Sequence, residues 1–259
     1  MELNGKTVLL TGASGGIGRA IAHELASAGA QLMLCGRNPA ALEALDLPGR
    51  GHQVVVADVT TQLGRAALVS ALDARPLDIL INNAGVNQLA LLEGMSDLEV
   101  EQQMATNLTA PILLTKALLS RLQRRPEAMV VNVGSALGSI GMAGSVPYCA
   151  SKFGLRGFSE ALRRELADTS VKVLYFAPRA TATALNSDAT NALNAALKTT
   201  VDRPEEVAAE LLQTMQKSRP RNHYLGWPEK FFVRLNALLP GLVDGAVRKQ
   251  LPVIKRFAR

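Results

Sequence analysis

The sequence predicts an α/β fold, in which a doubly wound parallel sheet is covered by helices on both faces, in a single domain with an added amphipathic C-terminal helical tail. Short apolar runs alternate with longer segments of helical periodicity, and no hairpin signals pair the runs. The runs are almost purely apolar, as strands buried on both faces must be. With 259 residues, of which 48% are hydrophobic, the chain can bury one large core.

Each expected element rests on a local pattern. The predicted strands are the apolar runs at residues 7–10, 31–35, 53–57, 77–81, 128–133 and 171–176, with a short last strand at 224–226. The predicted helices cover residues 19–28, 39–47, 64–74, 97–125, 147–169 and 204–217. Gly29 is a C-cap signal for the first helix, and Pro204 followed by two glutamates suits the first turn of the last one.

Composition excludes several classes of protein. The net charge of +6 lies in the tail, since residues 217–259 hold ten basic and two acidic residues, and the rest holds 18 basic and 20 acidic ones. A basic patch confined to the tail, without a recognition motif, does not favour nucleic-acid binding. Cys35 and Cys149 are too few for a disulfide scaffold, so we expect reduced thiols and a cytoplasmic protein. No secretory signal, membrane-spanning segment or metal site is expected.

A glycine-rich turn follows the first predicted strand and precedes a helix. It reads TGASGGIG at residues 11–18, and its candidate cofactor contacts are Gly12, Ser14, Gly16, Ile17 and Gly18. Glycine lets phosphate oxygens approach the backbone, and the free N–H groups of the helix start favour a pyrophosphate. A tight turn without a ligand is the alternative, but the position after the first strand of an alternating chain favours a Rossmann fold that binds a dinucleotide.

The end of the second predicted strand indicates which dinucleotide is bound. An acidic side chain usually accepts from the ribose hydroxyls there, but this chain has Gly36 and Arg37. A guanidinium suits a 2′-phosphate, so we expect NADP(H), with Ser14 as a second phosphate contact. A solvated surface charge is the alternative role for Arg37.

Tyr148 and Lys152 form a pair one helical turn apart, near the start of a predicted helix. A nearby ammonium favours the phenolate, so we expect Lys152 to depress the pKa of Tyr148. Ser135 follows the fifth strand, where a parallel sheet opens into its ligand crevice, and its hydroxyl is placed to polarise a carbonyl.

With these motifs the chain resembles the short-chain dehydrogenases/reductases, in their single-domain branch. The shared motifs stand in the family's order, with the thirteen-residue step from Ser135 to Tyr148. They are TGASGGIG, Asp58 in ADVT, Asn82-Asn83-Ala84-Gly85, Asn107 in ATNLTAP, Ser135 and Tyr148-Cys149-Ala150-Ser151-Lys152. The resemblance covers residues 1–183 well and the helix at 204–217 loosely.

The resemblance implies a role for each residue. Tyr148 would be the general acid, Lys152 would hold the nicotinamide ribose, Ser135 would orient the carbonyl, and Asn107 would hold a water in a proton relay. The implied cofactor contacts beyond the glycine turn are Arg37, Asp58, Val59, Asn83, Ala84, Gly85, Tyr148, Lys152, Pro178, Thr181 and Thr183. A dimer or tetramer is also implied.

One segment departs from the family pattern. Where the family has Pro-Gly and then an aliphatic residue before threonine, this chain reads Pro178-Arg179-Ala180-Thr181-Ala182-Thr183. Two roles for Arg179 stay open, namely binding an acidic group of the substrate or cofactor, or pointing outward. The following lid segment, residues 184–201, has no aromatic residue, which favours an aliphatic or extended substrate.

The tail extends beyond the expected end of the fold. We expect residues 1–226 to form the NADP-binding domain and residues 227–259 a basic amphipathic extension, broken at Pro240-Gly241. Such a segment can lie on a membrane surface, pack on the body or a subunit interface, or dock an acidic carrier protein.

Two functions from different classes follow. The first is an NADP(H)-dependent oxidoreductase that interconverts a ketone and a secondary alcohol, with a hydrophobic, acyl- or lipid-like substrate. The second is a non-catalytic NADP-binding regulatory or scaffold protein. The complete set of Asn107, Ser135, Tyr148 and Lys152 favours the enzyme, and the short chain and its glycine spacing disfavour an epimerase or dehydratase of the extended branch.

Overall fold

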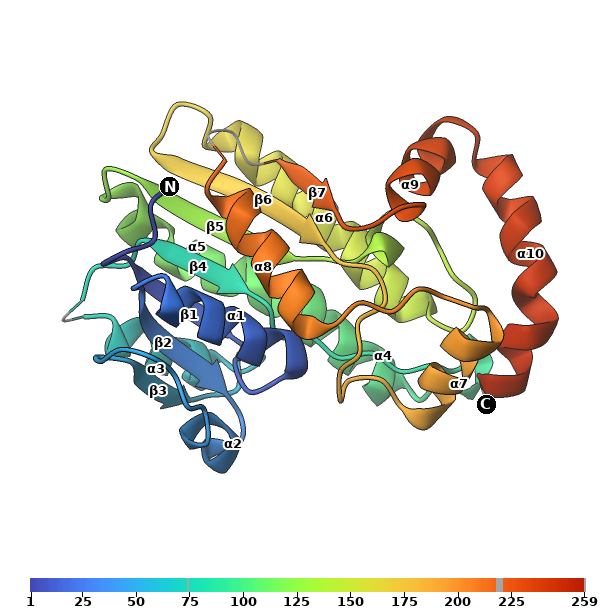
Figure 1. The fold of residues 1–259 in the computed structure, drawn as a ribbon, viewed down its shortest axis with the longest axis horizontal. Helices are drawn as coiled ribbons and strands as arrows, with labels where there is room; N and C mark the ends of the chain where they lie inside the picture. The colour runs from blue at the N-terminus through green and yellow to red at the C-terminus, as the bar shows by residue number, and fades with distance from the viewer. Residues whose placement is uncertain (74, 218–220, 259) are drawn as a thin grey trace.

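The fold is a seven-stranded, wholly parallel sheet, as the sequence predicted, and its strands lie in the order β3-β2-β1-β4-β5-β6-β7 (Figure 1). The computed structural model describes residues 1–73, 75–217 and 221–258. The strands are β1 (Thr7–Thr11), β2 (Gln31–Gly36), β3 (Gln53–Val56), β4 (Ile79–Asn82), β5 (Ala128–Val133), β6 (Val171–Ala177) and β7 (Asn222–Tyr224). The strand order reverses between β1 and β4, which is where a sheet of this kind opens a ligand crevice.

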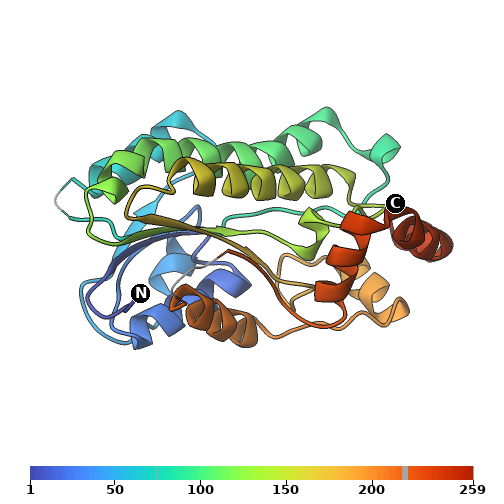
Figure 2. The same ribbon diagram turned by 90° about the horizontal axis from the view of Figure 1, so that it is seen from above.

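Helices cover both faces of the sheet, and each face has its own apolar core (Figure 2). On one face lie α1 (Gly16–Ser27), α2 (Pro39–Glu43) and α8 (Pro204–Met215). On the other lie α3 (Gln62–Ala71), α5 (Ala110–Gln123) and α6 (Val146–Glu165), and α4 (Asp97–Met104) packs against α6. Because β1, β4 and β5 are buried on both faces, their apolar runs need no alternation.

Several predicted bounds were wrong, each for a local reason. The helix predicted at 39–47 ends at Glu43. The last strand, predicted at 224–226, lies at Asn222–Tyr224, because its pairing with β6 defines it and its apolar content does not. The helix predicted at 64–74 begins at Gln62, where the Thr61 hydroxyl caps it, and ends at Ala71; Ala74 lies outside the described residues. The continuous helix predicted over 97–125 contains a π-helical turn at Ala105–Thr109.

The C-terminal residues form two helices at one end of the sheet, α9 (Glu229–Leu238) and α10 (Pro240–Phe257) (Figures 1 and 2). The predicted break at Pro240-Gly241 is confirmed. α10 packs against α7 (Asp188–Ala196), a helix within the lid segment that the sequence analysis did not expect. Among the described residues, no helix combines the length and apolar character that a bilayer crossing needs.

Candidate active site

A single cleft at the carboxyl ends of the strands contains the residues that the sequence singled out. Its volume is about 580 Å³, within the range of small-molecule sites. The loops after β1, β2, β3, β4, β5 and β6 all contribute to its wall, and the lid segment closes one side. All of the predicted cofactor contacts line it, and so do Ser135 and Arg179, whereas Asn107 lies behind the wall.

The glycine turn is packed tightly around two of its glycines, Gly12 and Gly18. Gly12 has φ +66°, and a Cβ there would lie 2.8 Å from Cα of Ala84. A Cβ on Gly18 would lie 2.0 Å from the carbonyl oxygen of Gly12. The Asn83 amide donates to the carbonyls of Thr11 and Gly12, both at 3.1 Å, and so fixes the turn to the end of β4.

The turn has the features that a bound pyrophosphate needs. α1 begins at Gly16 without a side-chain cap, so its first N–H groups keep no side-chain acceptor. Its dipole points into the cleft, where Ser14, Gly16 and Ile17 form the wall. The residues present therefore fit a dinucleotide phosphate bridge.

The far end of the cleft carries the groups expected to meet an adenosine ribose. Arg37 is exposed there, and Gly36 is so close to Ser14 that a Cβ would lie 3.1 Å from the Ser14 hydroxyl oxygen. Burial raises the pKa of Asp58, but hydrogen bonds from Thr60 and the nearby Arg37 charge outweigh it and hold the pKa below its usual value. One oxygen of the Asp58 carboxylate, Oδ1, is thus held within its own turn, and Arg37 is an exposed cation available to a ligand phosphate.

Tyr148 and Lys152 face each other across one turn of α6. The ammonium nitrogen of Lys152 lies 5.7 Å from the centre of the Tyr148 ring and donates to the carbonyl of Val133 at 2.9 Å. The side chain of Ser135, in the loop after β5, lies near enough to the Tyr148 hydroxyl to lower its pKa in part. The three side chains therefore meet at one point of the cleft wall.

The pKa values at this point differ from the expected ones. Burial raises the pKa of Tyr148 to about 12, although the side chain of Ser135 lowers it in part. Burial lowers the pKa of Lys152 to about 8. The expectation that Lys152 depresses the phenol pKa was therefore wrong, because removal from water dominates both groups.

Asn107 lies within the π-helical turn and is fully buried. Its carbonyl oxygen accepts from the N–H of Val86 at 2.9 Å, and its amide donates to the carbonyl of Val86 at 2.9 Å and to the Ser151 hydroxyl at 3.1 Å. A π-helical turn within a helix is rare and is frequently found at functional sites. Here it turns Asn107 toward the loop after β4 and toward α6.

Tyr175 is a site residue that the sequence analysis missed. Its hydroxyl accepts from the N–H of Ser135 at 3.3 Å and donates to the carbonyl of Ser135 at 3.2 Å. The ring fills the space over Gly134, where a Cβ would lie 2.2 Å from it. No sequence signal distinguished Tyr175 from the apolar residues of its strand, because only the packing brings it under Ser135.

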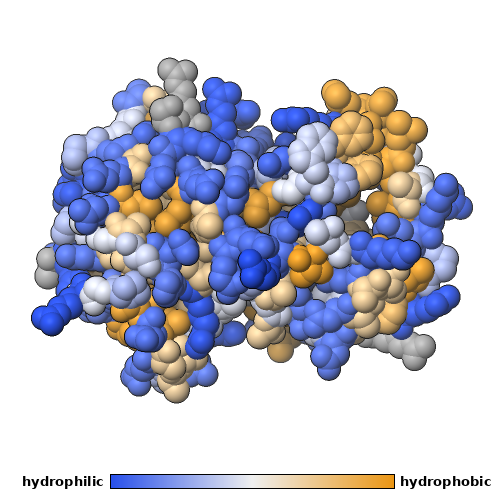
Figure 3. Space-filling view, in the orientation of Figure 1, coloured by the Kyte–Doolittle hydropathy of each residue, from blue (hydrophilic) through white to orange (hydrophobic). Residues whose placement is uncertain are grey.

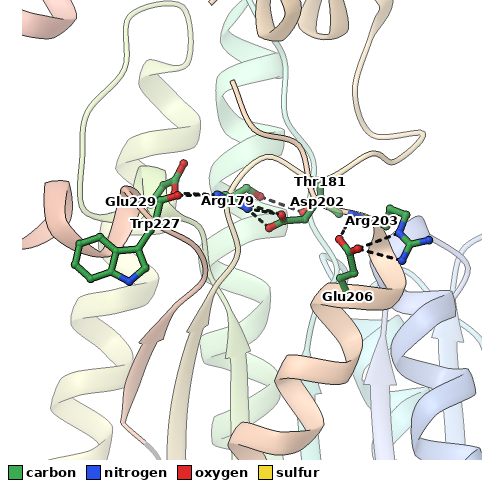
Figure 4. A network of polar contacts seen from close by, with 7 residues as sticks. All are labelled: Arg179, Thr181, Asp202, Arg203, Glu206, Trp227 and Glu229. Atoms are coloured by element: carbon green, nitrogen blue, oxygen red, sulfur yellow. Dashed lines mark hydrogen bonds and ion pairs between the residues drawn. The ribbon is translucent and has the colours of Figure 1, made fainter. Parts of the chain in front are cut away.

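Arg179 takes neither of the two roles left open for it. Its guanidinium pairs with Asp202 at 2.7 Å and with Glu229 at 3.3 Å, and donates to the carbonyl of Trp227 at 3.1 Å (Figure 4). Asp202 also forms a parallel bridge with Thr181. Arg179 thus joins the two ends of the lid segment to the start of α9.

The side of the cleft beside the lid is lined by Leu89, Met142 and Leu193, with Asn186, Thr190 and Asn194 among them. Leu193 of α7 packs with Ile254 of α10 and with Ala258 just after this helix, and this cluster also contacts Leu89 and Met142 of the cleft wall. The extension therefore covers the outside of the lid, which the sequence analysis left open as one of three roles for the tail.

The fold and the site together define an oxidoreductase of the dinucleotide-binding α/β class. The family profile described as short chain dehydrogenase matches residues 6–194. The chain belongs to the short-chain dehydrogenase family, as the resemblance implied.

Curated relatives cover most of the chain. The 3-oxoacyl-[acyl-carrier-protein] reductase FabG of Vibrio cholerae is 37% identical over 197 residues, 75% of this chain and 79% of the relative. Nodulation protein G of a Rhizobium species is 38% identical over 183 residues, 68% of this chain and 74% of the relative.

Solved structures match nearly the whole length. A short-chain dehydrogenase from Streptomyces avermitilis has a TM-score of 0.79 at 27% identity and covers 97% of this chain and 98% of its own. A short-chain dehydrogenase/reductase from Burkholderia phymatum, solved in complex with NAD, has a TM-score of 0.83 at 23% identity, with 93% and 96% covered, and so supports the fold alone.

Proposed function

We propose that this protein is an NADPH-dependent reductase that interconverts a ketone and a secondary alcohol on an acyl- or lipid-like substrate. The observation that carries the proposal is the meeting of Tyr148, Lys152 and Ser135 at one point of the cleft wall. A non-catalytic NADP-binding protein has no need for this arrangement, so we do not favour that alternative.

The three side chains divide the work of carbonyl reduction. Tyr148 is protonated at neutral pH, since burial raises its pKa, and it donates its proton to the substrate oxygen. The Ser135 hydroxyl donates a hydrogen bond to the same oxygen and polarises the carbonyl. The Lys152 ammonium stabilises the phenolate left on Tyr148 after proton transfer. A bound nicotinamide supplies the hydride.

Asn107 and Tyr175 act indirectly, Asn107 through a water that serves Tyr148 and Tyr175 through Ser135. We propose that the Asn107 carbonyl, held by Val86, keeps one lone pair for a water that returns the proton to Tyr148. Tyr175 is a positioning residue, because its hydroxyl fixes the backbone of Ser135 on both sides.

We propose NADP(H) as the cofactor, held by the turn at residues 12–18, by Arg37, Asp58 and Val59, by residues 83–85, and by Pro178, Thr181 and Thr183 together with Tyr148 and Lys152. The exposed guanidinium of Arg37 supports the choice over NAD(H), because it follows β2 where an acidic side chain usually accepts from the ribose hydroxyls. The apolar cluster around Leu193 of the lid, and relatives whose printed name is 3-oxoacyl-[acyl-carrier-protein] reductase, support an acyl chain as substrate.

We further propose residues 1–226 as the cofactor-binding domain and residues 227–259 as an extension of a cytoplasmic enzyme, peripheral on the inner face of a membrane. A homo-oligomer is supported by apolar side chains left exposed on α4, α5 and α6, namely Leu98, Leu113 and Phe153. Light scattering of the purified protein tests this state, and a monomer at all concentrations would count against it.

The experiment for the main proposal is a panel of aliphatic ketones and β-ketoacyl thioesters, each incubated with NADPH and with NADH. We expect loss of reduced-nicotinamide absorbance with NADPH and the longer acyl substrates. No turnover with any ketone, despite measurable NADPH binding, would favour the non-catalytic protein.

A further inference from the structure

An apolar surface is left uncovered where α9 meets α10. Leu238, Leu239 and Leu242 are 79%, 53% and 63% exposed, and Phe231 of α9 is 49% exposed. Figure 3 shows hydrophobic residues gathered over α9, at the end of the molecule farthest from β3. We call the surface formed by these four residues and by Arg234, Lys249 and Arg256 the basic corner. Contiguous exposed apolar residues on a folded chain usually mark a binding surface.

The inner faces of the same helices are already used. Val233 of α9 and Val243 and Ile254 of α10 are buried, and Ile254 packs against Leu193 of the lid helix α7. The apolar residues of the basic corner remain largely exposed, although the ring of Phe231 packs edge-on against that of its neighbour Phe232. Packing on the body thus explains one face of the extension and not the other.

The outward face of α10 is basic. Lys249 and Arg256 follow Leu242 at successive steps of seven residues, which places all three along one side of the helix. Arg248 and Lys255 are also exposed next to this line. On α9, Arg234 lies between Phe231 and Leu238 on the outward side. Between residues 230 and 258 the sequence has one acidic residue, Asp244.

The positive charge of the basic corner indicates which kind of partner it binds. A second copy of the chain, pairing corner to corner, would bring two clusters of like charge together, which is unfavourable. An anionic lipid surface attracts the same cations and accepts the leucines of the corner among its acyl chains. The surface therefore complements a negatively charged bilayer better than it complements itself.

We propose that the basic corner docks the protein on an anionic lipid surface. Docking places the substrate side of the cleft beside the bilayer, because α10 packs on the lid helix α7 and on the wall residues Leu89 and Met142. It follows that the enzyme takes its ketone substrate from the bilayer, and this conclusion rests on the proposed function.

Co-sedimentation of the full-length protein with phosphatidylcholine vesicles, with and without phosphatidylglycerol, tests the docking. We expect binding to the anionic vesicles that salt weakens. Leu238→Ser/Leu242→Ser should reduce the partition at least roughly tenfold, because two large apolar side chains no longer enter the lipid. Lys249→Gln/Arg256→Gln should reduce it roughly thirtyfold at low salt, and not reduce it at high salt.

Matched controls lie on other helices. Leu63 of α3 and Leu92 of the 3₁₀ turn before α4 are 84% and 53% exposed, so Leu63→Ser/Leu92→Ser removes the same chemistry elsewhere. Lys116→Gln/Arg124→Gln on α5 removes two exposed cations. Both controls should bind vesicles as the unchanged protein does. Thermal melts of all variants should coincide, because every substituted side chain is exposed.

Two results would overturn the docking. One is equal partition of the corner variants and their controls. The other is a fall in molar mass, measured by light scattering without vesicles, on substitution of the corner, since a second copy would then be the partner. Reduction of the water-soluble ketone ethyl acetoacetate without vesicles should be unchanged in Leu238→Ser/Leu242→Ser. If neither the unchanged protein nor any variant reduced ethyl acetoacetate, that result would count against the proposed reaction. It would not change the conclusion drawn from vesicle binding.

Discussion

Arg179 holds Asp202 with three hydrogen bonds, two from its Nε at 3.0 and 2.9 Å and one from an Nη at 2.7 Å. Both side chains are mostly buried, with 14% and 13% of their surfaces exposed. The pair closes the base of the lid, since Asp202 ends the lid segment and Arg179 precedes it (Figure 4). An arginine in place of the family's usual glycine is thus a structural part of this lid.

Arg179→Ala should therefore destabilise the protein. Two carboxylates, Asp202 and Glu229, lose their common cation in a largely buried setting, and we expect the free energy of unfolding to fall by roughly 2–4 kcal/mol. Denaturant unfolding measures this. The exposed pair Arg203–Glu206 is the matched control, and Arg203→Ala should leave stability unchanged within error. Equal effects of the two substitutions would show that Arg179 is not structural.

The packing of the glycine turn predicts the effect of Gly18→Ala. Its methyl group would overlap the carbonyl oxygen of Gly12, so the turn must shift. We expect a loss of roughly 1–3 kcal/mol in stability and weaker NADPH binding. Gly157→Ala on α6 is the control, because nothing lies within 4 Å of its Cβ, and it should stabilise the protein slightly. Unchanged NADPH affinity in Gly18→Ala would contradict a phosphate site at this turn.

We expect Arg37 to determine the preference for NADPH over NADH. Arg37→Ala removes the exposed guanidinium beside Ser14, and a lost charged hydrogen bond corresponds to roughly tenfold to hundredfold weaker NADPH binding. The Kd for NADH, which lacks the 2′-phosphate, should change little. Titration of both cofactors checks this, with Arg124→Ala as a control on α5. Equal losses for both cofactors would exclude a 2′-phosphate contact.

The buried Lys152 predicts how stability depends on pH. Its folded pKa of about 8 is below its unfolded value, so the folded state releases the proton first. Below pH 8 the buried charge costs stability in full, and this cost is relieved as pH rises from about 8 toward 10.5. Lys152→Met has no buried charge, so its free energy of unfolding at pH 7 should exceed that of the unchanged protein by on the order of 2 kcal/mol. This difference should shrink as the pH rises toward 10. A difference independent of pH would contradict this assignment.

The sequence was a good guide where the signal is local. The apolar runs predicted the parallel strands, and the motif residues Ser135, Tyr148 and Lys152 do meet, because the carboxyl ends of parallel strands share one edge. The partners of Arg179 were not predictable, since Asp202 and Glu229 are 23 and 50 residues away. The raised pKa of Tyr148 depends on burial, which no spacing reveals.

The most direct test of the central claim is Tyr148→Phe, which removes only the hydroxyl that is proposed to give up the proton. We expect ketone reduction to fall by roughly 10²- to 10⁴-fold, the usual contribution of a general acid, with NADPH affinity and thermal stability retained. The measurement is the single-turnover rate with saturating NADPH, beside a cofactor titration of the same sample. Full activity in Tyr148→Phe would contradict the account.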